Sequence, residues 1–174
     1  MASYYYLMSS LPMLKPSGDM PFSYDTFLEM CASVVSKSKY NLLKDLTLES
    51  TDGPLVSEWA KFYSVFKAEL SFQRNQNLSR PCETPYDRDD SIVRAVASAI
   101  EDENPLDAEK SLLDLQFQKL DLLIGTHNFD DFSLFGYALK LKLIERRSSF
   151  NQKSGREELD RMVDGLQKQI LSIG

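Results

Sequence analysis

Residues 57–77 read SEWAKFYSVFKAELSFQRNQN and carry the clearest structural signal in the chain. Large apolar side chains recur there at spacings of three and four residues. They are Trp59, Phe62, Tyr63, Phe66 and Leu70. This spacing is the period of an α-helix and places all of them on one face. We expect this aromatic face to pack into a core, because the alternative, a stacking platform for a cofactor, lacks a polar counterpart.

Helical periods and capping signals continue on both sides of this stretch. Ser23, Asp89 or Asp90, Asn104, Asp130 or Asp131, and Ser154 are suited to begin helices, and Gly125 is suited to end one. Further helices are expected at 24–36, 40–48, 90–101, 105–124, 131–149 and from about 155 onward. The sequence therefore predicts an all-α fold, a helical bundle of six to seven helices.

The N-terminus is unusually rich in aromatic residues. Residues 4–12 read YYYLMSSLP, although chain ends are commonly polar and loose. The β-propensity of the tyrosines favours an extended N-terminal segment over residues 4–8. A terminus with this much apolar surface is expected to be bound to the fold or to a partner, which makes Tyr4, Tyr5 and Tyr6 candidate partner-binding residues.

The chain has 174 residues, a length typical of one domain. A loop at 79–89 contains Pro81 and Pro85 and is the best candidate boundary inside the chain. We expect a single helical domain over residues 1–174, with the alternative of two lobes that meet near 79–90.

Charge is distributed unevenly along the chain. Residues 1–80 carry 8 basic and 8 acidic side chains, residues 81–131 carry 4 and 13, and residues 132–174 carry 8 and 5. The acidic and basic stretches could form neighbouring helices with attractive solvated faces, or the acidic stretch could bind a basic partner. The net charge of −6 argues against broad binding of nucleic acid, which requires a basic face.

The cysteines and the hydropathy pattern predict a cytoplasmic protein. Cys31 and Cys82 form no Cys-x-x-Cys motif, and two cysteines are too few for a disulfide framework. The N-terminus lacks the basic region of a signal peptide, and no stretch approaches the ~20 apolar residues of a transmembrane helix. We therefore expect no direct insertion into a membrane.

No catalytic, cofactor-binding or metal-binding pattern emerges from the sequence. His127 is the one histidine and stands near Asp130 and Asp131, which leaves open an enzyme that uses these groups. The segment 87–90, with sequence DRDD, lacks the glycine and the distal glutamate of a calcium loop. There is no glycine-rich phosphate loop and no nucleophile elbow. We expect a non-catalytic protein without a cofactor or a metal.

The densest group of polar side chains belongs to the expected helix 131–149. Lys142, Arg146 and Arg147 follow Tyr137 on this helix, together with Lys140 and Glu145. These charges could form a solvated face, or they could form a docking face on which the arginines bind carboxylates in a bidentate geometry. The docking interpretation makes Tyr137, Lys142, Arg146 and Arg147 candidate partner-binding residues.

Two segments together resemble a known bacterial family. They are 4–12, with Tyr-Tyr-Tyr-Leu followed by Leu-Pro, and 129–147, with FDDF, YALKLK and ERR in that order. The family is encoded alongside the components of V/A-type rotary ATPases in spirochaetes and Bacteroidetes-type bacteria. The second segment is also similar to helices of the all-helical component that caps the central stalk of these enzymes, which we call the stalk cap. Operons of this type lack an obvious stalk cap.

The resemblance implies a mechanical role. The stalk cap sits on the membrane rotor ring and accepts the base of the central shaft, so a protein that stands in for it would contact both. It would be cytoplasmic and peripheral to the inner membrane through the complex. The alternative is a general helical adaptor or assembly factor of another complex.

Overall fold

The computed structural model describes residues 4–85, 87–149 and the single residue 161. These residues form helices and no strand, which confirms the predicted all-α fold class. The helices of the described residues are α1 (Tyr5–Ser10), α2 (Tyr24–Ala32), α3 (Lys37–Lys44), α4 (Val56–Asn77), α5 (Asp90–Glu101), α6 (Pro105–Ile124) and α7 (Asp131–Ser149). Apart from Arg161, the helix start expected at Ser154 and the helix expected from about 155 onward lie outside the described residues.

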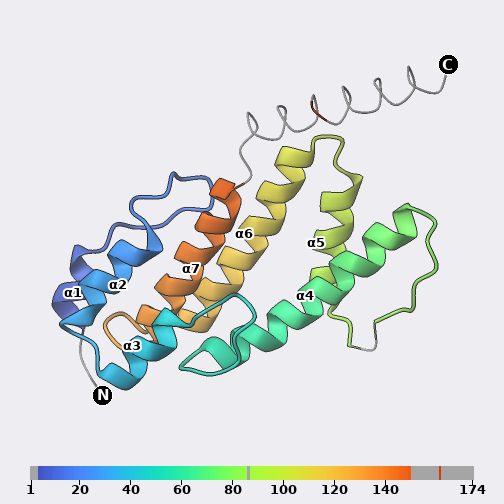
Figure 1. Cartoon of the computed structure of the whole chain (residues 1–174). Coiled ribbons are helices and arrows are strands. Elements are labelled where there is room, and N and C mark those ends of the chain that lie inside the picture. The colour runs from blue at the N-terminus through green and yellow to red at the C-terminus, as the bar shows by residue number, and fades with distance from the viewer. Residues whose placement is uncertain (1–3, 86, 150–160, 162–174) are drawn as a thin grey trace.

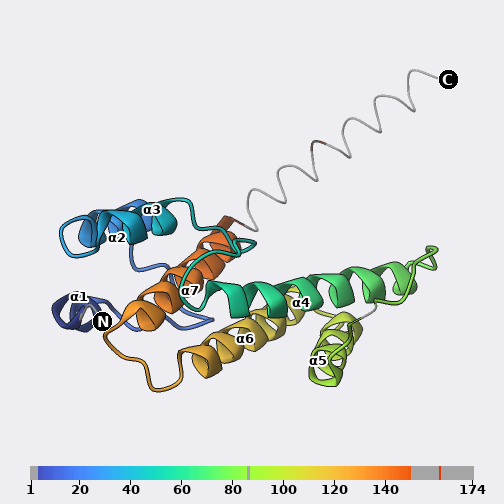
Figure 2. The same ribbon diagram turned by 90° about the horizontal axis from the view of Figure 1, so that it is seen from below.

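The antiparallel pair of α6 and α7 lies at the centre of the packed arrangement. Helix α2 packs on α7 and on α3, whereas α4 packs on α6, and α5 packs on both α4 and α6. Figures 1 and 2 both show α1, α2 and α3 at one end of the molecule and α5 at the other. Helix α7 thereby brings the N-terminal helices against the rest of the bundle.

Local capping groups set several of the helix boundaries as predicted. The Ser23 hydroxyl accepts a hydrogen bond from a backbone N–H of α2 at 3.2 Å, and the Asp89 carboxylate accepts one from α5 at 2.8 Å. Asn104 caps α6 at 3.1 Å, and Gly125 follows its last residue with a φ of 53°. These side chains satisfy N–H groups that have no partner within the helix.

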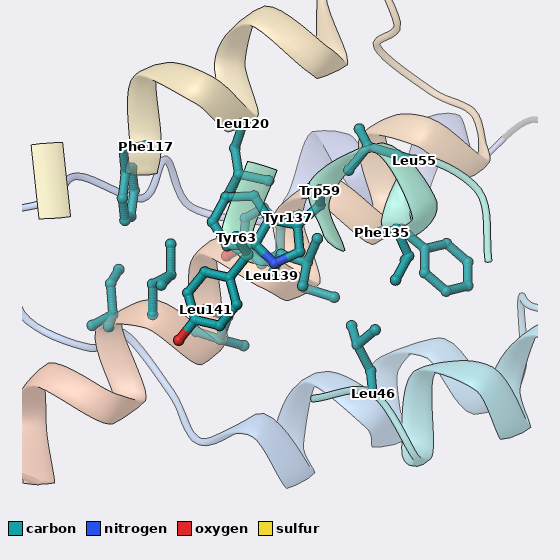
Figure 3. Close-up of a cluster of buried hydrophobic side chains, with 14 of the residues drawn as sticks. Leu46, Leu55, Trp59, Tyr63, Phe117, Leu120, Phe135, Tyr137, Leu139 and Leu141 are labelled. Carbon is teal, nitrogen blue, oxygen red and sulfur yellow. The ribbon is translucent and has the colours of Figure 1, made fainter. Parts of the chain in front are cut away.

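The aromatic face of α4 lies in the core, which confirms that interpretation. Trp59 is fully buried and stacks on Tyr63 with 5.4 Å between the ring centroids. Its indole N–H donates to the carbonyl of Leu48 at 3.0 Å. Figure 3 shows these rings among Leu120 of α6 and Leu139 of α7. The core therefore joins residues of α4, α6 and α7.

The extended segment predicted for residues 4–8 is wrong, because residues 5–10 form the short helix α1. The described residues contain no strand with which this segment could pair. The helical conformation instead buries Tyr4 and Leu7, which are three residues apart, and bonds the N–H of Met8 to the carbonyl of Tyr4 at 2.9 Å. Tertiary burial thus overrides β-propensity, which largely reflects side-chain packing within a sheet.

Two further boundaries differ from the sequence expectation. The helix expected at 24–36 ends at Ala32, and the helix expected at 40–48 spans Lys37–Lys44. Val35 is buried in the connection between them, whereas Val34 is 47% exposed. Val35 is thus buried because the chain changes direction after α2, and not because α2 continues.

Candidate functional site

The N-terminus is bound to the start of α7 by backbone and side-chain contacts. The N–H of Tyr4 donates to the carbonyl of Phe129 at 2.7 Å, and the Tyr4 hydroxyl donates to Asp131 at 2.8 Å. The ammonium of Lys39 on α3 lies 2.6 Å from both carboxylate oxygens of Asp131. One carboxylate therefore connects α1, α3 and α7.

This connection raises the pKa values of two of its groups. Burial, followed by the hydrogen bond to Asp131, raises the pKa of Tyr4. The hydrogen bond to Asp131 raises the pKa of Lys39 against the opposing effect of its own desolvation. The Tyr4 hydroxyl thus stays protonated and Lys39 stays charged at neutral pH. Tyr4 is only 2% exposed, so in this conformation it holds the N-terminus in place rather than contacting a partner.

The neighbouring aromatic side chains are exposed. Tyr6 is 88% exposed, Tyr5 is 54% exposed and Phe129 is 38% exposed. The ring of Tyr5 lies 4.8 Å from that of Phe129 and 5.5 Å from that of Tyr6. We call Tyr5, Tyr6 and Phe129 the aromatic patch. Exposed aromatic clusters are typical of protein–protein interfaces, where such side chains are enriched.

His127 lies beside this patch and contributes to the helix boundary. Its ring stacks on Phe132 at a centroid distance of 4.6 Å, and Nδ1 contacts the Asp130 carboxylate. Asp130 also accepts a hydrogen bond from the N–H of Ser133 at 3.2 Å, so it caps α7. Burial acts to raise the pKa of Asp130, but the bonds from His127 and Ser133 outweigh it and hold this pKa below its usual value.

Tyr137 and Arg147, two predicted partner-binding residues, bind the chain itself. The buried Tyr137 hydroxyl donates to the carbonyl of Pro12 at 3.1 Å, and burial raises its pKa to about 12. The Arg147 guanidinium donates to the carbonyls of Pro16 and Gly18. These contacts hold the segment between α1 and α2 along α7, and they occupy the hydroxyl of Tyr137 and the guanidinium of Arg147.

Lys142 and Arg146 lie on another side of α7. The Lys142 ammonium is 3.6 Å from the ring centroid of Tyr24 and 3.0 Å from Glu145. Arg146 donates to the hydroxyl of Tyr63 on α4 at 3.0 Å. Tyr137, Lys142, Arg146 and Arg147 thus contact different parts of the chain, and their role in partner binding stays a prediction.

Sequence reasoning does not select Lys39, Asp131 or Phe129 as site residues. The sequence presents Asp131 only as a helix cap or a partner for His127, and Phe129 only as part of the motif at 129–132. Lys39 gives no signal, because it is 92 residues away from Asp131 in the chain. The paired segments 4–7 and 129–132 are the available clue, since both carry unusual aromatic content.

No family model, curated protein or solved structure matches this chain. Among the described residues, no three or more His, Cys, Asp or Glu side chains are grouped so that they could hold a metal ion. Within the same part of the chain, no helix combines the length and the apolar character needed to cross a membrane.

Proposed function

We propose that this chain is a non-catalytic subunit or accessory protein of a V/A-type rotary ATPase. In this role it would help to couple the central stalk to the membrane rotor ring, as the stalk cap does. The observation that carries the proposal is the direct contact between the two segments that resemble the ATPase-linked family. Tyr4 of the first segment bonds to Phe129 and Asp131 of the second.

The geometry of this contact suits a protein-binding surface. Tyr4, Lys39 and Asp131 fix the backbone that carries the aromatic patch, so binding would require little ordering of the chain. A tyrosine or phenylalanine buries roughly 150–250 Å² when it is fully covered. The three aromatic side chains of the patch could therefore form the centre of a contact with the shaft or the ring.

The proposal places the protein in the cytoplasm, peripheral to the inner membrane through the complex. The segment resemblance supports this location, because the stalk cap occupies the cytoplasmic side of the ring. The helices of the described residues agree with attachment through protein contacts, since none could span the membrane.

The second candidate function is a helical adaptor or assembly factor of another complex. The exposure of the aromatic patch favours it as well, because Tyr5 and Tyr6 would suit a range of protein partners. The candidates differ in what the patch binds, so one experiment separates them.

The experiment is a pull-down of the tagged full chain from native membranes solubilised in mild detergent. We expect catalytic, shaft and ring proteins of the ATPase to be recovered in constant ratio, and Tyr5→Ser with Tyr6→Ser to reduce recovery at least about tenfold, as expected for central aromatic contacts. The matched control is Leu106→Ser with Leu122→Ser, which removes two exposed apolar side chains of α6 outside the patch.

Each result has a distinct meaning. Absence of ATPase proteins with intact bait would reject the ATPase proposal and favour the adaptor. Equal losses in the patch variant and the α6 control would show that the patch is not the contact. Circular dichroism of both variants checks that the fold is retained.

A further inference from the structure

A groove of about 1100 Å³ lies beside α4, on residues that the aromatic patch does not use. One wall is the face of α4 that contains Tyr63, Phe66 and Leu70, and another is the connection 46–49. The end of α7 contributes Lys142 and Arg146. Three separate parts of the chain therefore form one open binding surface.

Hydrogen bonds and an ion pair within the chain connect the walls of the groove. The indole of Trp59 holds the connection 46–49 through the carbonyl of Leu48, and Lys67 pairs with Glu49 across the groove. On the α7 side, Arg146 bonds to the hydroxyl of Tyr63. A preorganised surface loses little conformational freedom on binding, so its contacts count more fully toward affinity.

The groove is basic although the protein is acidic. Its lining includes the cations Lys67, Arg74, Arg80, Lys142 and Arg146. The acidic side chains of the lining are Glu49 and Glu145, and both are already paired with lysines of the groove. The whole chain has a net charge of −6, so this surface has the opposite sign to the average of the molecule.

Two of these cations can exchange their contacts at little cost. Arg74 pairs with Glu109 at 3.2 Å, and both side chains are more than half exposed, so water screens the pair and it contributes little to stability. Arg80 is exposed and has no ion-pair partner among the described residues. Carboxylates of a ligand could therefore bind both guanidinium groups, in the bidentate geometry that arginine favours.

The size and floor of the groove favour a peptide over a small molecule. Small-molecule pockets are mostly enclosed and measure roughly 300–1000 Å³, whereas this groove is larger and open. Leu48 is half-buried and Leu78 is 62% exposed in its lining, where they lie among side chains that include the buried Phe66 and Leu70. An amphipathic helix in a groove uses this combination of apolar floor and charged rim.

We propose that this groove binds an acidic amphipathic segment of a partner protein. Leucine or phenylalanine side chains of the segment pack against the accessible surface of Leu48 and Leu78, and its carboxylates meet Arg74 and Arg80. The inference goes beyond the proposed ATPase association and does not rest on it, because it concerns other residues and holds for any partner of this chemistry.

The test uses the full chain and a synthetic probe. The probe is a fluorescein-labelled helical peptide of about 18 residues, roughly 27 Å long, with leucines on one face and glutamates on the other. Fluorescence anisotropy should show saturable binding that weakens with added salt. A matched peptide with lysine in place of every glutamate should not bind. Failure of the acidic probe to bind, or equal binding of both peptides, would overturn the proposal.

Charge reversals locate the binding. Arg74→Glu with Arg80→Glu should weaken binding of the acidic probe at least about tenfold, because two attractive contacts become repulsive. The control is Lys37→Glu with Arg94→Glu, an equal change of charge at exposed positions outside the groove. The control should bind like the unaltered chain. Equal weakening in both variants would indicate general attraction and reject the groove as the site.

A photo-crosslinking amino acid at Ser71 identifies the occupant. Ser71 is exposed and lines the groove. Adducts between this position and the acidic probe, located by mass spectrometry, would support the proposal. Crosslinks could instead lead to residues 150–174 of the same chain or to a second copy of the chain. If these crosslinks persist in excess probe, the groove belongs to that occupant and the proposal is overturned.

Discussion

Glu69 is a buried carboxylate on α4, the helix that also carries the aromatic face. It is 1% exposed, and it accepts hydrogen bonds from Arg88 at 2.7 and 2.8 Å and from Gln73 at 2.6 Å. The Arg88 guanidinium also lies over the ring of Phe72 at 5.2 Å. One residue of α4 thereby anchors the connection between α4 and α5. Neutralising its charge tests how much of the fold depends on this anchor.

Glu69→Ala should destabilise the chain by about 2 kcal/mol, because it leaves the Arg88 guanidinium without its carboxylate and removes one of the two acceptors of Gln73. The matched control is Glu58→Ala on the same helix, whose pair with Lys61 is exposed and should change stability by less than about 0.5 kcal/mol. Urea unfolding measures both. Equal stability of the two variants would show that the buried pair contributes no more than a surface pair.

The same carboxylate predicts a pH dependence. The hydrogen bond from Arg88 lowers the pKa of Glu69 below its usual value of 4.5, although burial opposes the shift. A folded-state pKa that lies below the unfolded one stabilises the fold above pH 4.5, and this stabilisation is lost as the pH falls through the folded-state pKa. Glu69→Gln, which does not titrate, should differ most from the unaltered chain near about pH 6 and least near about pH 3. The free energies of unfolding of the variant and of the unaltered chain are measured across this range. A difference between them that stays constant with pH would contradict the lowered pKa of Glu69.

At the scale of elements, α6 and α7 approach each other closely at a glycine. A Cβ atom added to Gly136 would lie 2.5 Å from two side-chain carbons of Ile124 at the end of α6. Leu55 is the next neighbour, at 3.7 Å. Real Cβ atoms do not approach other carbons to 2.5 Å, so the two helices can pack this closely only because residue 136 has no Cβ. This explains why α7 has a glycine, a residue of low helix propensity, in its interior.

Gly136→Ala should therefore destabilise the chain by about 1–2 kcal/mol, although alanine favours a helix by about 1 kcal/mol over glycine. In an Ile124→Ala background, which removes the clashing carbons, the same substitution should cost less or stabilise the chain. Gly18→Ala is the control, since its nearest neighbours would be at an ordinary 3.4 Å. Additive effects of the changes at 136 and 124 would contradict the close-packing explanation.

At the scale of the whole molecule, one hydrophobic core runs from Tyr4 to Ile144 and includes side chains of all the described helices. Helix α5 joins it through Ile92, Val96 and Ala99, although the loop 79–89 lies between α5 and α4. The expectation of one domain over residues 1–174 remains a prediction, as does the alternative of two lobes that meet near this loop. Continuity of the core favours the former, because a separate lobe would need a core of its own.

A single cooperative domain should unfold in one transition. Trp59 fluorescence reports on the core between α4, α6 and α7, whereas far-UV circular dichroism reports on all helices. We expect the two urea transitions to coincide. A second transition seen only by circular dichroism would instead support two lobes, and faster hydrogen exchange in α5 than in α7 would identify the weaker one.

The sequence by itself determined that the chain is helical in the regions of α2 to α7, although not in α1, and where several of these helices begin and end. Ser23, Asp89, Asn104 and Gly125 act on groups within four residues along the chain, so their effect is local and readable from the sequence. Periodicity also identified the buried face of α4, because a helix places residues three and four apart on one side regardless of what covers it.

Only the tertiary structure decided what these helices contact. Tyr4 and Asp131 are 127 residues apart, so their hydrogen bond depends on how all the intervening helices pack. The same packing turned residues 5–10 into a helix and directed Arg146 and Arg147 to different neighbours. It also gathered the groove from α4, the connection 46–49 and α7. Such contacts depend on the positions of whole elements, and no local spacing in the chain encodes them.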